Sequence, residues 1–152
     1  MTVTATTHAT VILVGATAAL IRGRSGAGKS RLAWDLLQAA ARSKGFGALP
    51  FARLVADDRV YLEAQHGRLL ARPPAELAGL IEVHGLGLRH LPFEPLAAVG
   101  FVVDLAAEDA ARHPAPTTAT VAGIALPRLA VAPATVALPL VLAYLCTAAA
   151  LD

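Results

Sequence analysis

The stretch GRSGAGKS, residues 23–30, decides the fold, because it fits the phosphate-binding pattern G-x-x-x-x-G-K-[ST] without a mismatch. Glycines let the backbone turn its N–H groups inward without Cβ clashes, and a helix that starts near Lys29 adds a positive dipole end. The Lys29 ammonium can reach the β- and γ-phosphates of a nucleotide, and the Ser30 hydroxyl can ligate Mg²⁺. The predicted binding residues for ATP are Gly23, Arg24, Ser25, Gly26, Ala27, Gly28, Lys29 and Ser30. The competing interpretation is a glycine-rich turn that merely precedes a helix.

The segments around this loop supply the strand–loop–helix context that the pattern requires. Residues 8–14 and 17–22 predict two strands around a turn at Gly15, and residues 29–42 have the apolar spacing of a helix. Further predictions are a strand at 51–58, a hairpin at 59–74, a short helix passing into a strand at 75–93 and a strand at 97–106. Residues 121–133 predict a last strand pair or one bent strand, a helical tail follows Pro133, and loops are expected at 43–50 and 107–119. We therefore expect a single α/β domain over residues 1–152, with mixed strands and the nucleotide at their carboxyl edge.

Composition excludes several classes of function. The chain of 152 residues is 56% hydrophobic with a net charge of +2 and contains no run of Lys or Arg, so we expect no nucleic-acid binding. Its one cysteine, Cys146, allows no internal disulfide and no zinc ligand set. The single cysteine and an N-terminus without the basic residues of a signal peptide together predict a cytoplasmic protein.

Residues 129–151 are uncharged and long enough to span a bilayer, but Pro133 and Pro139 favour a core or interface helix over a membrane span.

Two adjacent carboxylates, Asp57 and Asp58, follow the apolar run RLVA. A carboxylate at the end of a strand beside a phosphate loop commonly holds Mg²⁺. Because neighbouring strand residues point to opposite sides, one carboxylate can face the metal while the other accepts a proton from an incoming hydroxyl. The alternative is a solvated strand end that caps the next turn.

Together, the segments HATVILVG, GRSGAGKS, RLVADDRV, IEVHGLGL and VAGIALPRLAV resemble the catalytic domain of the HPr serine kinase/phosphorylases. These bacterial enzymes phosphorylate a serine of HPr, the phosphocarrier protein of the sugar phosphotransferase system. The resemblance runs from His8 to about Pro133 and implies a P-loop kinase core with a mixed sheet, of the HPr kinase and PEP-carboxykinase type. The separate N-terminal domain of the family is absent from this sequence, as in the short alphaproteobacterial forms.

The resemblance also implies roles for individual residues. Asp58 would be the catalytic base in phosphorylation and the acid in the reverse direction, and His8 would lie near the reaction centre. Asp57 would help to hold the metal together with Ser30, and Glu82 would be the second magnesium ligand. Arg112 lies near the place of an active-site arginine of the family.

Four departures from the family pattern shape what we expect of this chain. His84 and His90 replace an arginine and an acidic residue of the family's signature, and the segment ARSKGFGALPFA at 41–52 is longer. The uncharged APATVA at 132–137 replaces a basic stretch tied to dephosphorylation, and the C-terminal helical region is shortened. We therefore expect kinase chemistry to be retained better than phosphorylase chemistry.

The resemblance implies HPr or an HPr-like carrier as the partner, with ATP and Mg²⁺ as cofactors. Two alternatives stay open, namely a P-loop kinase with another acceptor and a regulatory module that binds ATP without catalysis. Family enzymes are hexamers, so a homo-oligomer is also implied. Leucines of the apolar tail would line its interface or would cover the domain's own sheet, namely Leu138, Leu140, Leu142 and Leu145.

Overall fold

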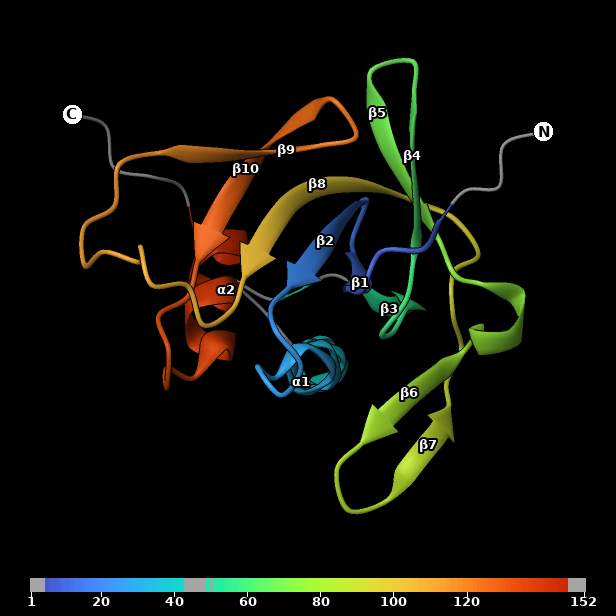
Figure 1. Ribbon diagram of the computed structural model, residues 1–152. Coiled ribbons are helices and arrows are strands. Elements are labelled where there is room, and N and C mark those ends of the chain that lie inside the picture. Colours follow the sequence, from blue (N-terminus) through green and yellow to red (C-terminus); the bar gives the residue numbers. More distant parts are fainter. Residues whose placement is uncertain (1–4, 43–48, 50, 148–152) are drawn as a thin grey trace.

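The fold is built on an eight-stranded mixed sheet with two helices, seen in a computed structural model that describes residues 5–42, 49 and 51–147 (Figure 1). The elements are β1 (Thr10–Val14), β2 (Thr17–Arg22), α1 (Lys29–Arg42), β3 (Ala52–Ala56), β4 (Tyr61–Gln65), β5 (Arg68–Arg72), the 3₁₀ turn η1 (Ala75–Leu77), β6 (Leu80–Val83), β7 (Gly87–His90), β8 (Ala97–Asp104), β9 (Thr117–Val121), β10 (Ile124–Ala130) and α2 (Ala137–Cys146). The main sheet has the order β3-β1-β2-β8-β10-β9, and the β4–β5 hairpin joins it through β8. Strands β6 and β7 form a separate hairpin.

Strand direction explains why distant segments meet at one edge of this sheet. Strand β1 is antiparallel to both β2 and β3, so β2 and β3 run the same way. Strand β8 is parallel to β2 and to β10. The carboxyl ends of β2, β3, β8 and β10 therefore lie at the same edge, and β1 begins there. The phosphate loop, Asp57, Asp58 and His8 all belong to this edge.

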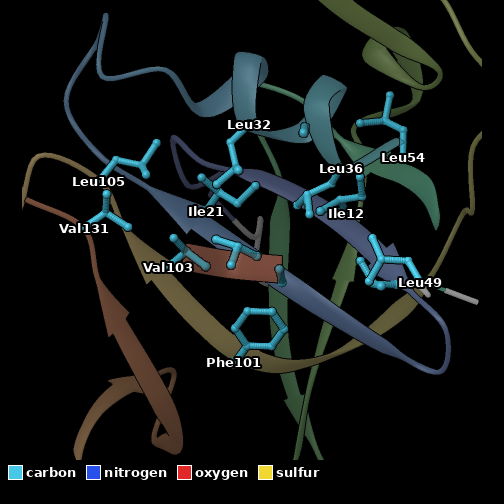
Figure 2. Packing of buried hydrophobic residues seen from close by; sticks show 14 of the residues in the cluster. Ile12, Ile21, Leu32, Leu36, Leu49, Leu54, Phe101, Val103, Leu105 and Val131 are labelled. Carbon is cyan, nitrogen blue, oxygen red and sulfur yellow. The ribbon is translucent and has the colours of Figure 1, made fainter. Parts of the chain in front are cut away.

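The core forms on both faces of the sheet because apolar residues alternate along its strands. Ile12, Ile21 and Phe101 lie on the face that α1 and α2 cover, where they pack with Leu32 and Leu36 of α1 (Figure 2). A second cluster on the opposite face contains the alternate strand residues Val11, Leu20, Val55, Leu69 and Val102. Spacing of four residues between Leu32 and Leu36 puts both on one helical face, which is why this sequence forms a buried helix beside the sheet.

Most of the predicted elements are confirmed, including the α/β class, the helix at 29–42 and the hairpin that turns at His66 and Gly67. Three predictions were wrong in detail. Residues 80–90 form a hairpin rather than one strand, Thr117 already belongs to β9, and β3 ends at Ala56, before the two aspartates. The tail is helical over α2, whereas the predicted loop at 43–50 lies outside the described residues except for Leu49. No helix in the described part of the chain is long and apolar enough to cross a membrane.

Candidate active site

The phosphate loop closes around its own lysine. Gly26 and Gly28 adopt φ angles of 83° and 99°, a region that is costly for residues with a Cβ. The buried Lys29 donates hydrogen bonds from Nζ to the carbonyl oxygens of Gly23, at 2.9 Å, and Arg24, at 3.2 Å. This arrangement holds an ammonium group inside the loop at the start of α1, where a phosphate chain would gain most from its charge.

A buried carboxylate, Asp57, ties the loop to three other elements. Its Oδ1 accepts hydrogen bonds from the hydroxyls of Ser30, at 2.7 Å, and Thr10, at 2.9 Å. Its Oδ2 accepts the backbone N–H of Glu82 at 3.1 Å. Because α1, β1 and β6 each supply one donor, this single side chain fixes their relative positions at the sheet edge.

Asp58 follows at a tight turn that sends its side chain away from Asp57. The N–H of Arg59 donates to the carbonyl of Asp57 at 2.8 Å, and Asp58 has a φ of 69°, close to that of the strained γ-turn. Its Oδ1 lies 3.3 Å from Nε2 of His8, and the two side chains are 60% and 46% exposed. The two aspartates therefore differ sharply, since Asp57 is buried and accepts three hydrogen bonds, whereas Asp58 is open to solvent beside a histidine. The turn, and not strand alternation, separates them.

A pocket of about 350 Å³ brings the loop and the His8–Asp58 pair together. This P-loop pocket is lined by His8, Thr10, Ser25, Gly26, Gly28, Lys29, Ser30, Arg31, Trp34, Asp58, Glu82, Val83 and His84. Asp57 does not line it, but all three of its hydrogen-bond donors, Thr10, Ser30 and Glu82, do. Arg112 does not line it either, and lies exposed in the segment between β8 and β9. Three predicted loop residues, Gly23, Arg24 and Ala27, also lie outside the pocket wall, and all the other predicted site residues line it.

The oxygen donors beside Lys29 fit a magnesium ion. Ser30 and Glu82 line the pocket, and Asp57 bonds to Ser30 from behind. Within residues 5–42, 49 and 51–147, no three His, Cys, Asp or Glu side chains group as a metal site. Mg²⁺ commonly binds through one or two carboxylates together with substrate phosphates, rather than in a cage made only of protein. The donor set therefore suits Mg²⁺ that arrives with a nucleotide.

Beneath the loop, a charged network joins the ends of three strands. Asp104 accepts hydrogen bonds from Nε and Nη2 of Arg22, at 2.7 and 2.9 Å, and from Nε of Arg128, at 2.5 Å. Arg128 also pairs with the exposed Asp109. Burial raises the pKa of the Asp104 carboxyl, but the hydrogen bonds and charges of both arginines outweigh burial and hold that pKa below its usual value. Since Arg22 directly precedes Gly23, the network supports the base of the phosphate loop.

Sequence reasoning missed two features of this site. Thr10 is fully buried, and its signal was one polar residue at the start of an apolar strand. Its partner Asp57 lies 47 residues away in the chain, so spacing alone does not reveal the pair. In the Arg22–Asp104–Arg128 network, Arg22 and Asp104 are 82 residues apart in the chain, so no local sequence pattern predicts this network either.

The sequence pattern of the family described as "HPr Serine kinase C-terminal domain" matches residues 1–92, which carry the loop, both aspartates and Glu82. The chain belongs to this family. The HPr kinase/phosphorylase of Clostridium tetani is 35% identical over 85 residues, which cover 56% of this chain and 24% of that protein. That of Clostridium beijerinckii is 36% identical over 81 residues, which cover 53% and 23%. The match thus spans about a quarter of the length of these relatives.

The fold of the HPr serine kinase C-terminal domain extends beyond the matched sequence. The structure of the HPr(Ser) kinase/phosphatase from Coxiella burnetii superposes with a TM-score of 0.73, at 22% identity, and covers 93% of both chains. At this level of identity the likeness concerns the fold. It confirms the predicted α/β fold with a mixed sheet, and it includes the strands after residue 92.

Proposed function

We propose that this chain is an ATP-dependent protein kinase that phosphorylates a serine of HPr, or of an HPr-like phosphocarrier. One observation carries the proposal: the open Asp58 carboxylate, 3.3 Å from His8, lines the same pocket as Lys29 and Ser30 of the phosphate loop. A phosphate donor and a proton acceptor thus meet in one cavity, as transfer to a hydroxyl requires. Membership in the HPr serine kinase family supports serine as the acceptor and a cytoplasmic reaction.

The proposed reaction is an in-line transfer in the P-loop pocket. Asp58 accepts the proton of the serine hydroxyl, the oxygen forms a bond to the γ-phosphorus, and the bond to the β-phosphate oxygen breaks to release ADP. Lys29 neutralises charge on the phosphates. His8 orients the Asp58 carboxylate, which is exposed and would otherwise rotate freely. In the reverse direction Asp58 returns the proton as an acid.

Ser30 and Glu82 would hold Mg²⁺, while Asp57 orients the Ser30 hydroxyl from behind. When bound, the metal supplies positive charge that offsets the charge of the β- and γ-phosphates. The part that Asp57 plays is therefore to position a ligand. The role predicted for Arg112 stays a proposal that depends on movement of the segment between β8 and β9, because in this structure that side chain does not line the pocket.

The acceptor can be identified with ATP that carries a radioactive γ-phosphate, purified HPr and the full chain. We expect label on a serine of HPr, identified by mass spectrometry, and none when Lys29→Met replaces the ammonium with an apolar side chain. ATP turnover without label on HPr would point to another acceptor. Binding of ATP with neither turnover nor label would show a regulatory module instead of a kinase, an alternative that His84 at the pocket wall keeps open.

A further inference from the structure

A second pocket, of about 330 Å³, borders the phosphate loop on the side away from His8 and Asp58. Its size falls in the range of about 300 to 1,000 Å³ that small-molecule sites occupy. This side pocket shares Gly26, Gly28 and Arg31 with the P-loop pocket, so the two cavities meet at the loop. In Figure 1 the chain leading into α2 lies on one side of the start of α1, and the β6–β7 hairpin lies on the other.

Backbone hydrogen bonds hold the floor of the side pocket in place. The N–H of Leu105 donates to the carbonyl of Arg22 at 2.9 Å, which joins the floor to the residue before the phosphate loop. The N–H of Val131 donates to Asp104, at 2.9 Å, and that of Ala107 donates to Val131, at 2.8 Å. Leu105 and Val131 are both buried. These bonds fix the floor of the side pocket to the ends of β2, β8 and β10.

The chemistry of the lining changes from one end of the side pocket to the other. Arg24 and Arg31 stand at the loop, and Arg31 pairs with Asp35 at 3.2 Å. The opposite wall is apolar, with Ala134, Val136 and Leu138 among its residues. Val136 is 71% exposed, the highest value among the exposed large hydrophobic residues of the described chain. An apolar residue so open to water beside a formed cavity is suited to cover the flat face of a ring.

The direction of a bound phosphate chain links these observations. If the terminal phosphorus lies beside Asp58, the other end of the chain must leave the loop on the opposite side, where the side pocket opens. We propose that the side pocket binds the nucleoside half of the nucleoside triphosphate, with its base against the wall formed by Ala134, Val136 and Leu138. This inference rests on the proposed kinase function. The wall residues lie outside residues 1–92, so the family match does not assign them.

Calorimetry with magnesium and two ligands, ATP and inorganic tripolyphosphate, tests the inference, because only ATP has a nucleoside. Val136→Asn removes apolar surface, yet Val136 is the N-cap of α2, where Asn is favoured, so the fold should be kept or stabilised. Ala132 is half-buried and lines the side pocket, so the larger side chain of Ala132→Phe would fill part of this cavity. Leu86→Asn is the matched control, because Leu86 is 63% exposed and lines neither pocket.

We expect Val136→Asn and Ala132→Phe to weaken ATP binding by roughly three- to tenfold and to leave tripolyphosphate within about twofold of wild type. Leu86→Asn should change neither affinity. If both ligands bind wild type equally well, or if the two pocket variants bind ATP as wild type does, the nucleoside site is wrong while the phosphate loop and the kinase proposal stand. If wild type binds neither ligand, the proposed function itself fails, and the inference fails with it.

Discussion

At the scale of single residues, the site depends on the contrast between a buried aspartate and an open one. Asp57 is 6% exposed and accepts three hydrogen bonds, so it positions its neighbours. Asp58 is open and paired with His8, so it is free to meet an acceptor. The sequence shows two identical side chains in a row. Their different roles come from the turn at Asp58, which no residue pattern predicted.

Replacing Thr10 tests the support of Asp57. Thr10→Val keeps the shape of the side chain but removes one of the hydroxyls that donate to Asp57, which should lower the free energy of unfolding by about 1 to 3 kcal/mol. Binding of Mg-ATP should weaken as well, because Ser30 bonds to the same carboxylate oxygen. Urea unfolding and calorimetry measure the two effects. Thr10→Ser keeps the hydroxyl and is the control, and equal losses in both variants would show that the hydrogen bond is unimportant.

At the scale of elements, the parallel pairing of β2 with β8 places the phosphate loop. Gly100 of β8 faces Thr17 of β2, where an added Cβ would lie 1.8 Å from Oγ1 and 3.2 Å from Cβ of Thr17. The register of this pair shifts between Ala18 and Ala19, close to the same point. A residue without a side chain therefore lets the two strands approach at the start of the pairing that ends at the loop.

Gly100→Ala should therefore destabilise the fold by about 1 to 3 kcal/mol through overpacking, measured as a fall in the urea midpoint. Thr17→Ala alone should cost less, because it removes the Thr17 hydroxyl and methyl groups without forcing atoms together. In the double variant the loss should be smaller than the sum of the two single losses, because the Oγ1 clash is gone. Strictly additive losses would contradict the contact.

How far the sequence predicts the elements depends on how local their signals are. The loop at 23–30, the helix α1 and the hairpin around Gly67 were predicted from short patterns whose physics is contained within each segment. The β6–β7 hairpin was misread as one strand. Its turn, HGLG at 84–87, contains glycines that suit either a bend or a turn. The strand order of the sheet depends on pairing between distant segments and was not predicted.

At the scale of the whole molecule, the Arg22–Asp104–Arg128 network joins β2, β8 and β10 below the loop. Asp104→Asn would leave two arginines facing an uncharged amide, so it should cost about 1 to 3 kcal/mol of unfolding free energy at pH 7. Asp109→Asn, which removes an exposed partner of Arg128, is the control and should cost less.

The cost of Asp104→Asn should also depend on pH. The folded pKa of Asp104 is lowered, so its contribution is present above the unfolded pKa, about 3.9, and is lost as the pH falls through the folded pKa. The stability difference between wild type and Asp104→Asn should thus be constant near neutral pH and shrink below about pH 4. A difference that grows on acidification would contradict the network.

The same scale limits what sequence can reveal about the site. Residues 8–82 carry recognisable motifs, and the structure brings most of them into one pocket. The wall of the side pocket comes from residues 105–138. These small apolar residues form no motif, so only their position beside the loop in the folded chain indicates a site. The oligomer predicted from the apolar tail stays a prediction, with sedimentation as its test.

The central claim is that Asp58 accepts the proton while the phosphate loop holds the donor. The most direct test is the rate of phosphate transfer to HPr by Asp58→Asn, with the Kd for Mg-ATP measured on the same preparation. Glu63→Gln, the same change on an exposed residue of β4, is the control. We predict that Asp58→Asn lowers the rate by about 10²- to 10⁴-fold and leaves the Kd within about twofold, while Glu63→Gln changes neither. A transfer rate close to wild type in Asp58→Asn would contradict the account.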